Sequence, residues 1–329
     1  MRTDCVICPL RYHMFVTALD VALLTRVASL YYRERLTQQE IAHRMGVSRQ
    51  RVSRMLQQAE DVGVVRIEIS SPVADVEAVA RRLEETFGLK EAFVVVPNEP
   101  GETQAREAVG KAAALVLARQ VRPGMLLGLG WSTSVMAMIE HLGTADGREM
   151  RIVQLDGGVP HGPHPNETAD IVNRAGLALN AQAIALMTPL YVDTEAIRDA
   201  LVSDSQIREC LALGKRCGAA FFGVGAVSRR SNLYSTGFLA DDLIDELLAE
   251  GAVGEILGRF YGRDAKPSAI ELSRRTIGLE LEALAQVPFR CMIAFGEAKV
   301  EAILAGLRGK YANAIVTDEA TALALLAAP

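Results

Sequence analysis

The spacing of apolar residues near the start of the chain predicts two helices with a tight break between them. Residues 15–34 place apolar side chains at helical intervals, which predicts one amphipathic helix. Thr37 and Glu40 have the spacing of a capping box, in which each side chain bonds the backbone of the other residue. This pair opens a second helix over Gln38–Arg44, and Gly46 ends it.

A third helix follows this glycine turn. Ser48 is a good N-cap, the apolar spacing continues to about Asp61, and Gly63 stops the helix. Two helices joined by a tight turn that contains glycine form a helix-turn-helix. Residues 64–69 then alternate, which predicts a strand that acts as a wing or as a connection to the rest of the chain.

The pattern changes after residues 70–72, which are the best candidate for a domain boundary. A helix at 76–87 precedes a series in which short apolar strands alternate with helices. This alternation predicts an α/β domain with a Rossmann-like, doubly wound parallel sheet and helices on both faces. The predicted strands are 92–96, 125–129, 152–155, 181–186, 219–224, 291–295 and 314–317, with helices at 103–120 and 132–142.

Length and charge divide the chain in the same place. A length of 329 residues suggests two domains, which we place at 14–72 for the helix-turn-helix and 73–329 for effector binding and oligomerisation. Residues 1–72 carry ten Lys and Arg against seven Asp and Glu, whereas the remainder carries 25 against 33. A basic head on an acidic body is typical of a DNA-binding module joined to a small-molecule domain.

Several classes of protein are disfavoured by composition. No apolar run reaches the length of a membrane span, and the first residues show no signal-peptide pattern. The five Cys do not form a disulfide framework, so we expect a cytoplasmic, nucleoid-associated protein. The pairs Cys5 with Cys8 and His161 with His164 lack the further ligands of a metal site. We therefore expect no metal, no cofactor and no membrane partner.

The third predicted helix has the composition of a DNA recognition helix. Between Arg44 and Gln57 the sequence has four Arg and no acidic residue. Arg can bind guanine and Gln can bind adenine with paired hydrogen bonds, while hydroxyl groups near helix starts suit phosphates. The competing interpretations are a solvated helix face and a helix-turn-helix used only for protein contacts. The predicted DNA-binding residues are Thr37, Gln38, Ser48, Arg49, Gln50, Arg51, Ser53, Arg54 and Gln57.

Glycine-rich strand ends in the second domain predict a site for a small anion. Gly128 and Gly130 end a predicted strand, and Ser132, Thr133 and Ser134 then open a helix whose N-terminus attracts negative charge. The third glycine and the acidic residue of a dinucleotide-binding motif are missing, which favours a small phosphate over NAD. Further strand ends carry Gly157 with Gly158 and Gly223 with Gly225, and Lys299 begins a helix after another strand. Ligands of open parallel sheets bind at such ends.

These segments together resemble the SorC family of sugar-responsive bacterial regulators. The matching stretches occur in the family's order over nearly all of residues 36–326. They are LTQQEIAHRMGVSRQRVSRML, FGLKEAFVV, GLGWSTSV, VQLDGGV, FFGVGAV, GAVGEILGRFYG, IGLELEALAQVPF and EAKVEAILAGLRGKYANAIVTDEATALALL. The resemblance implies an effector domain similar to the glucosamine-6-phosphate deaminase and ribose-5-phosphate isomerase fold, without their catalysis. It also implies tetramers, often dimers of dimers, and we expect a homo-oligomer that is a dimer or a tetramer.

The resemblance further implies a phosphosugar effector and assigns residues to it. The phosphate would contact Gly130, Ser132, Thr133 and Lys299, and the sugar would contact Gln154, Asp156, Gly225, Asp241 or Asp242, and Glu255. Two departures matter. Asp156 stands where some members have a lysine that bonds an aldehyde sugar, so no Schiff base is expected there. Glu297 adds a negative charge near the expected phosphate, which leaves an unphosphorylated polyol or a sugar acid open.

We therefore predict a transcriptional regulator of sugar or polyol genes, not an enzyme. Its partners would be double-stranded operator DNA, a small sugar effector and further copies of the chain. The alternative is a sugar-phosphate isomerase or deaminase with an accessory DNA-binding domain, which needs a general base in the pocket. Asp156, Asp241 and Glu255 are the candidates, and no motif singles one out.

Overall fold

The chain forms two compact units, residues 1–70 and residues 71–329, and each is described by itself. The structure is a computed structural model. It describes residues 18–65, 74–144, 147–158, 167–235, 239–268 and 270–328. The predicted sites at Cys5, Cys8, His161 and His164 lie outside these residues.

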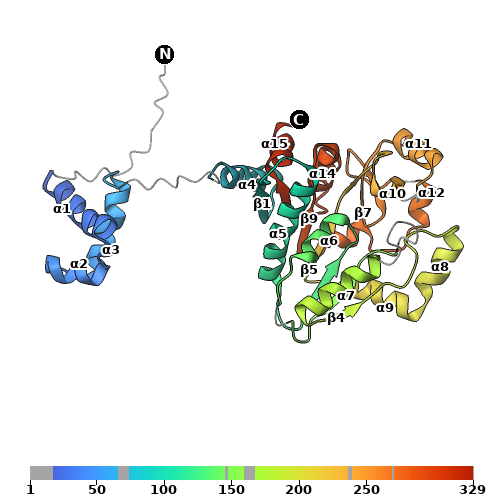
Figure 1. The fold of residues 1–329 in the computed structure, drawn as a ribbon, viewed down its shortest axis with the longest axis horizontal. Coiled ribbons are helices and arrows are strands. Elements are labelled where there is room, and N and C mark those ends of the chain that lie inside the picture. The colour runs from blue at the N-terminus through green and yellow to red at the C-terminus, as the bar shows by residue number, and fades with distance from the viewer. Residues whose placement is uncertain are drawn as a thin grey trace, which may run out of the picture. The chain divides into compact units, whose positions relative to one another are not determined.

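The first unit is a small helical bundle (Figure 1). The helix predicted over 15–34 is present over the described residues 18–33, as α1 (Ala18–Ala28) and a π-helical last turn, η1 (Ser29–Arg33). The helices α2 (Gln38–Met45) and α3 (Arg49–Asp61) follow as the sequence predicts. Their apolar faces meet in a core formed by Leu24, Val27, Ala28, Leu30, Ile41, Ala42, Val52, Met55, Leu56 and Ala59.

Local hydrogen bonds set the ends of the helix-turn-helix. The predicted capping box is present, because Glu40 N–H donates to Thr37 Oγ1 at 3.3 Å and Thr37 N–H donates to Glu40 Oε2 at 2.8 Å. Gly46 ends α2 at a φ of +66°, a left-handed conformation that suits glycine. Ser48 Oγ accepts from Arg51 N–H at 3.3 Å and caps α3. These four residues orient the two helices.

The strand predicted over 64–69 is not present at its first two residues. Val64 and Val65 form a bend after α3, and Val65 N–H donates to the Ala59 carbonyl at 2.9 Å. This bond extends the end of the helix and takes the donor that a strand ladder needs. Residues 66–69 lie outside the described part of the chain.

The second unit is built on a seven-stranded sheet in the order β1-β10-β9-β5-β2-β3-β4. Every pair of neighbouring strands in it is parallel, as the sequence predicts. The strands are short, and β2, β5 and β10 are buried at almost every position, which is typical of a sheet covered on two faces. They are β1 (Glu91–Val95), β2 (Leu126–Leu129), β3 (Arg151–Gln154), β4 (Gln182–Ile184), β5 (Ala219–Gly223), β9 (Phe289–Ile293) and β10 (Ala314–Asp318).

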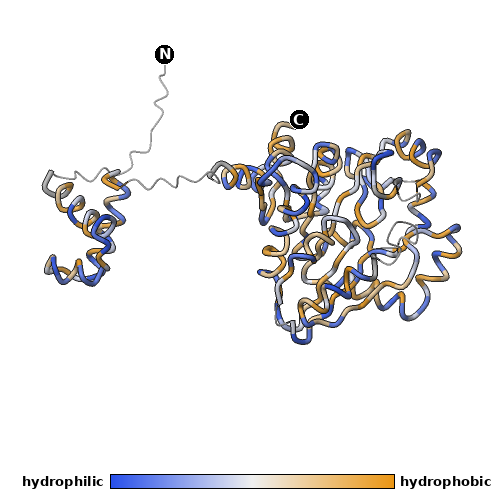
Figure 2. Tube along the Cα trace, in the orientation of Figure 1, coloured by the Kyte–Doolittle hydropathy of each residue, from blue (hydrophilic) through white to orange (hydrophobic). Residues whose placement is uncertain are grey.

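Helices cover both faces of this sheet, and a separate apolar cluster lies under each layer. One layer, in front of the sheet in Figure 1, is α5 (Glu102–Gln120), α6 (Thr133–Glu140) and α7 (Glu167–Leu179). The other layer is α4 (Ala74–Phe87), α9 (Ser205–Gly214), α14 (Val300–Arg308) and α15 (Glu319–Ala327). Figure 2 shows apolar and polar residues alternating along these helices, because each buries one face and exposes the other.

A small antiparallel sheet, which the sequence did not predict, lies between β5 and β9 in the chain. It contains β6 (Gly225–Ala226), β7 (Ala252–Ile256) and β8 (Arg259–Gly262) in that order. Short helices surround it, with a core of its own that includes Phe260. The remaining elements are α8 (Glu195–Ser203), α10 (Asn232–Ser235), α11 (Asp241–Ala249), α12 (Glu271–Arg274), α13 (Leu281–Leu284) and η2 (Glu297–Lys299).

The strand order reverses between β2 and β5. The chain leaves β2 toward β3 and β4, returns to β5, and then leaves in the opposite direction toward β9 and β10. Connections that depart to opposite sides leave a crevice at the carboxyl ends of the two central strands. This reversal therefore marks where a ligand site is expected.

The crossing of α5 and α6 gives a first test of the packing. A methyl group added at Gly110 of α5 would lie 2.8 Å from the backbone carbonyl of Ala137 in α6. Gly110→Val should therefore lower the free energy of unfolding by about 2–3 kcal/mol, the upper range for overpacking. Urea unfolding followed by the fluorescence of Trp131, the one tryptophan of the chain, measures this value.

Gly143→Val is the matched control, because a methyl group at Gly143 meets no atom within 4 Å. This exposed position should change the unfolding free energy by less than about 0.5 kcal/mol. Equal effects of the two substitutions would contradict the close approach of the helices.

Candidate functional site

A cavity of about 730 Å³ lies at the carboxyl edge of the parallel sheet. Its walls come from the segments that follow β1, β2, β5, β9 and β10, together with the small antiparallel sheet. The cavity thus includes the reversal point between β2 and β5. Its volume lies within the range of about 300–1,000 Å³ that is usual for small-molecule sites.

One corner of the cavity has the features of an anion site. Ser132 and Thr133 line it at the start of α6, where the helix dipole places partial positive charge. Ser132 Oγ accepts from Val135 N–H at 3.0 Å, so the serine caps the helix. Gly223 allows this approach, since a methyl group there would lie 2.5 Å from the Ser132 hydroxyl.

Lys299 adds a positive charge to the same cavity. It ends η2, after β9, and its Nζ lies 5.9 Å from the centre of the Phe295 ring. Burial lowers the pKa of Lys299, and the nearby Glu255 and Glu102 carboxylates partly oppose this change. Lys299 therefore stands partly desolvated among carboxylates, a state in which an additional anion would stabilise its charge.

Glu255 is a partly buried carboxylate in the cavity wall. It lies on β7, and burial raises its pKa to about 6. Its Oε1 accepts from Gly258 N–H at 2.5 Å, which fixes the side chain. Gly225 stands opposite in the β6–β7 register, and any side chain there would meet the carboxylate. Glu255 can therefore accept a hydrogen bond from a ligand hydroxyl at a defined position.

Carboxylates outnumber cations around the cavity. Among the described residues that line it, six are acidic and three are basic. Carboxylates accept hydrogen bonds from hydroxyl groups, whereas a cluster of cations binds phosphate. The charged lining residues are Glu99, Glu102, Glu255, Glu297, Asp318, Glu319, Arg106, Arg230 and Lys299.

The structure brings together five of the residues that the sequence assigned to the effector. Ser132, Thr133, Gly225, Glu255 and Lys299 all line the cavity. They come from four different segments of the chain, and only the sheet topology places them side by side. The remaining eight assigned residues do not line it.

Four of these eight are small residues that serve packing. A methyl group at Gly128 would meet the Leu155 side chain, and one at Gly130 would overlap Leu257. Gly157 lies against the backbone of Pro189, and Ser134 is buried in the first turn of α6. Their small size permits close approach within the protein, so they are not part of the cavity wall.

Gln154 and Asp156 lie behind the cavity. The Gln154 amide is buried, donates to the Asp156 carbonyl at 2.7 Å and accepts from Leu186 N–H at 3.2 Å. Asp156 is 2% exposed, and its carboxylate accepts from Trp131 N–H at 3.0 Å. Burial raises the pKa of Asp156 to about 7, and this hydrogen bond opposes the rise. Both residues therefore support the strand ends that carry the site.

Asp241 and Asp242 lie on the surface at the start of α11. Asp241 pairs with Arg229 at 3.2 Å and accepts from the Tyr234 hydroxyl at 2.7 Å, while Asp242 is exposed. Negative charge at a helix N-terminus is stabilising, which explains both residues without a ligand.

Sequence reasoning missed several residues of the cavity wall. Trp131 lies between two predicted residues, in GLGWSTS, and an aromatic ring at a strand end is a signal that could have found it. Arg106 and Arg230 also line the cavity. Each occurs in a segment that reads as solvated, so no local pattern distinguishes them.

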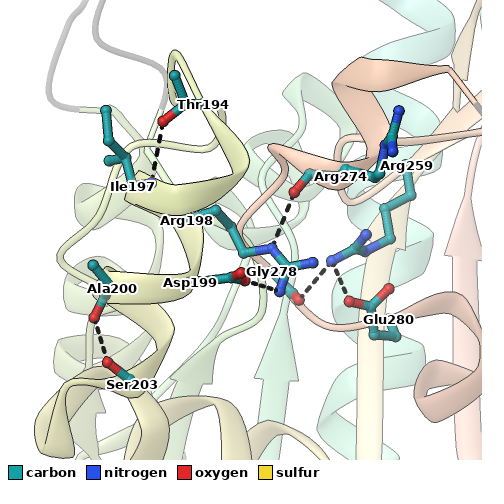
Figure 3. A network of polar contacts seen from close by, with 10 residues as sticks. All are labelled: Thr194, Ile197, Arg198, Asp199, Ala200, Ser203, Arg259, Arg274, Gly278 and Glu280. Carbon is teal, nitrogen blue, oxygen red and sulfur yellow. Dashed lines mark hydrogen bonds and ion pairs between the residues drawn. The ribbon is translucent and has the colours of Figure 1, made fainter.

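A buried arginine fixes the segment behind the small sheet (Figure 3). Arg259 of β8 donates to the Gly278 carbonyl at 3.1 Å and to Glu280 Oε1 at 2.7 Å. Gly278 in turn bridges to Asp156 through the backbone, and Arg198 of α8 donates to the Arg274 carbonyl at 3.0 Å. This network connects α8 and the 274–280 segment to the rear of the cavity.

In the first unit, α3 presents an uncompensated basic surface. Arg49, Arg51 and Arg54 are exposed, and among the described residues none of the three forms an ion pair. By contrast, Arg44 pairs with Glu34 at 3.2 Å. Three free guanidinium groups on a helix of about 13 residues form a surface suited to a phosphate backbone and to guanine edges.

The other predicted DNA-binding residues surround this surface. Ser48, Gln50, Ser53 and Thr37 are exposed, and Gln38 is half-buried. Gln57 is exposed too, and its amide donates to Asp61 at 3.4 Å. The hydroxyl groups of Thr37 and Ser48 are also helix caps.

No helix among the described residues is long and apolar enough to cross a membrane. Within the same ranges, no group of three His, Cys, Asp or Glu side chains is arranged to hold a metal ion.

Known proteins are similar to the chain over nearly its whole length. Residues 71–327 match the family described as "Putative sugar-binding domain", and residues 25–60 match "Sigma-70, region 4". The transcriptional regulator LsrR of Klebsiella pneumoniae subsp. pneumoniae is 33% identical over 93% of each chain. The deoxyribonucleoside regulator of Bacillus subtilis is 30% identical over 92% of this chain and 97% of its own.

A solved structure supports the same likeness. The full-length sorbitol operon regulator SorC from Klebsiella pneumoniae has a TM-score of 0.72 to this chain at 28% identity. The match covers 94% of this chain and 100% of the other.

The raised pKa of Asp156 predicts that the second unit loses stability as the pH rises. Its pKa is raised from 3.8 to about 7, so between these values the folded chain holds a proton that the unfolded chain releases. The contribution is fully present below about pH 4 and is lost as the pH rises through 7. Glu255, with a pKa raised from 4.5 to about 6, acts in the same direction.

Asp156→Asn isolates this effect, because asparagine keeps an acceptor for Trp131 N–H but does not ionise. The urea midpoint of the variant, measured by Trp131 fluorescence, should therefore fall less between pH 5 and pH 8 than the midpoint of the wild type. An unchanged pH dependence in the variant would show that Asp156 keeps its ordinary pKa.

Proposed function

Because the chain belongs to the SorC family of sugar-binding transcriptional regulators, we propose that it controls sugar or polyol genes by binding DNA through α2 and α3 and a small sugar in the cavity. The proposed DNA-binding domain is residues 14–72, and the proposed effector domain is residues 73–329. The two functions draw on separate units, each with its own apolar core.

The DNA-binding role rests on the basic surface of α3. A glycine turn positions α3 after α2, and α3 exposes three arginines without acidic partners among the described residues. A recognition helix places such side chains at base edges, and its neighbours hold the phosphate backbone. Modules of this kind usually bind two half-sites as dimers, so we propose that the chain acts as a dimer or a tetramer.

The choice of a sugar rests on one observation: a single cavity contains both an anion corner, formed by Lys299 and the start of α6, and a carboxylate wall, formed by Glu255 and the other acidic lining residues. Lys299 and the start of α6 suit one anionic group, such as a phosphate. Glu255 and the other carboxylates suit hydroxyl groups. A phosphorylated sugar or a sugar acid has both kinds of group, and an unphosphorylated polyol would use the carboxylates alone.

The proposed mechanism is allosteric. A sugar that binds the cavity shifts the population of chain conformations only if it binds one of them more tightly than the others. Closure of the cavity would then change how subunits pack and how paired recognition helices are spaced. Sites in two different units, coupled in free energy, satisfy the definition of allostery.

The positions of the carboxylates support a binding role over a catalytic one. Of the three candidate general bases, Asp156 lies behind the cavity and Asp241 lies on the surface in an ion pair. Glu255 alone faces the cavity, and Gly258 N–H already engages it. Turnover of sugar phosphates by the purified protein would favour an isomerase or deaminase instead.

The basic surface predicts the effect of two substitutions on DNA affinity. Arg49→Ala and Arg54→Ala should each weaken binding of the full chain to duplex DNA from its own upstream region by about 5- to 100-fold, since each removes a phosphate or base contact. Fluorescence anisotropy over a range of salt concentrations measures the affinity and its salt dependence.

Arg26→Ala is the control, because Arg26 is exposed on α1, outside the helix-turn-helix. It should leave affinity within about twofold. Equal DNA affinity for the wild type and the two α3 variants would indicate a helix-turn-helix that contacts only protein.

The anion corner predicts a second effect. In titrations of a panel of sugar phosphates, sugar acids and polyols followed by Trp131 fluorescence, we expect at least one saturating ligand. Lys299→Gln should weaken an anionic ligand at least about 10-fold, because a charge-assisted contact is lost. Asp242→Asn, outside the cavity, should change nothing, and equal affinities for all three proteins would contradict the site.

A further inference from the structure

We propose that Arg106 is a specificity-determining residue. When the effector binds, Arg106 breaks its ion pair with Glu102, and Arg106 and Lys299 together then hold the anionic group of the effector as a two-cation clamp. This inference rests on the proposed function, because it adds a residue to the same cavity. It predicts that the site prefers phosphate or carboxylate ligands over neutral polyols.

Arg106 occupies the correct place for this role. It lies one turn into α5, and both it and Glu102 line the cavity that holds Lys299. The helix α5 packs closely on α6 through Gly110, so the first turns of both helices meet the same space. Arg106 is near enough to Lys299 for its positive charge to act on the lysine, as does the charge of Glu102.

The hydrogen bonds of Arg106 are incomplete. Its Nη2 donates to Glu102 Oε1 at 2.5 Å. Its Nε is buried and has no hydrogen-bond partner among the described residues. These two groups lie on the same edge of the planar guanidinium, which matches two oxygens of a phosphate or a carboxylate. The two donors on this edge form a fork. Its Nη2 donor is occupied by Glu102, and its Nε donor has no partner among the described residues.

The energies favour an exchange of partners. The side chain of Glu102 is 77% exposed, so water screens its pair with Arg106 and the pair contributes little to stability. An anion within the cavity would meet Arg106, Lys299 and the start of α6 together, in a less hydrated place. Arg106 can therefore leave Glu102 for the anion at little cost, and it would relieve the unpartnered Nε in doing so.

A matched pair on the same helix separates this role from an ordinary surface ion pair. Glu107 and Lys111 have the same spacing on α5, and Lys111 Nζ lies 2.6 Å from Glu107 Oε1. Neither residue lines the cavity. Substitutions of this second pair alter charge and helix stability by similar amounts and leave the cavity intact.

The test is a titration of the full chain with inorganic phosphate at constant ionic strength, followed by Trp131 fluorescence and by calorimetry. The wild type should bind saturably. Arg106→Gln should weaken binding at least about 10-fold, and Arg106→Lys should be intermediate because it keeps the charge and loses the fork.

Glu102→Gln provides the sharpest comparison, because it removes the competitor of the anion. It should tighten phosphate binding by about two- to fivefold, opposite in sign to Arg106→Gln. Glu107→Gln and Lys111→Gln should leave binding within about 1.5-fold. Urea midpoints of all variants establish that each is folded.

The outcomes separate this inference from the proposed function. If Lys299→Gln abolishes phosphate binding while Arg106→Gln and Glu102→Gln bind as the wild type does, the inference is overturned and the sugar site stands. Absence of saturable phosphate binding by the wild type also overturns the inference, and the panel of sugars then judges the proposed function alone.

Discussion

The candidate site depends on one constraint, the convergence of parallel strand ends at the point where the strand order reverses. Connections leave β2 and β5 in opposite directions, so helices cannot close the space above both strands. Into this space the chain brings the start of α6, the end of η2 and the turn into β6. Each segment alone is an ordinary loop, and the topology makes them one cavity with an anion corner and a carboxylate wall.

Much of this arrangement could be predicted from the sequence. Alternating strands and helices indicated the parallel sheet, and glycine-rich strand ends indicated Ser132, Thr133 and Lys299. The pattern could not indicate on which side of a strand end a side chain lies. The resemblance to the SorC family assigned Gln154 and Asp156 to the sugar, although the structure turns these side chains toward the N–H groups of Leu186 and Trp131. Glycines that permit packing, such as Gly128 against Leu155, also read as parts of the site.

Arg106 shows a limit of a different kind. In the sequence its pair with Glu102 has the same spacing as the pair of Glu107 and Lys111, and both are typical of a solvated helix face. Only the packing of α5 on α6 directs the first pair into the cavity and the second pair to solvent. The small antiparallel sheet escaped prediction for a related reason, since its strands of two to five residues carry little periodic signal.

The central claim is that the cavity and the basic surface of α3 are coupled in free energy. Coupling of this kind is reciprocal, so a sugar that changes DNA affinity by some factor must have its own affinity changed by DNA by the same factor. The direct test identifies a co-purified ligand by mass spectrometry, then measures DNA affinity with and without that ligand, and ligand affinity with and without DNA. The account predicts equal factors of about 5 or more in the two arms. Independent affinities, with both factors near 1, would contradict it.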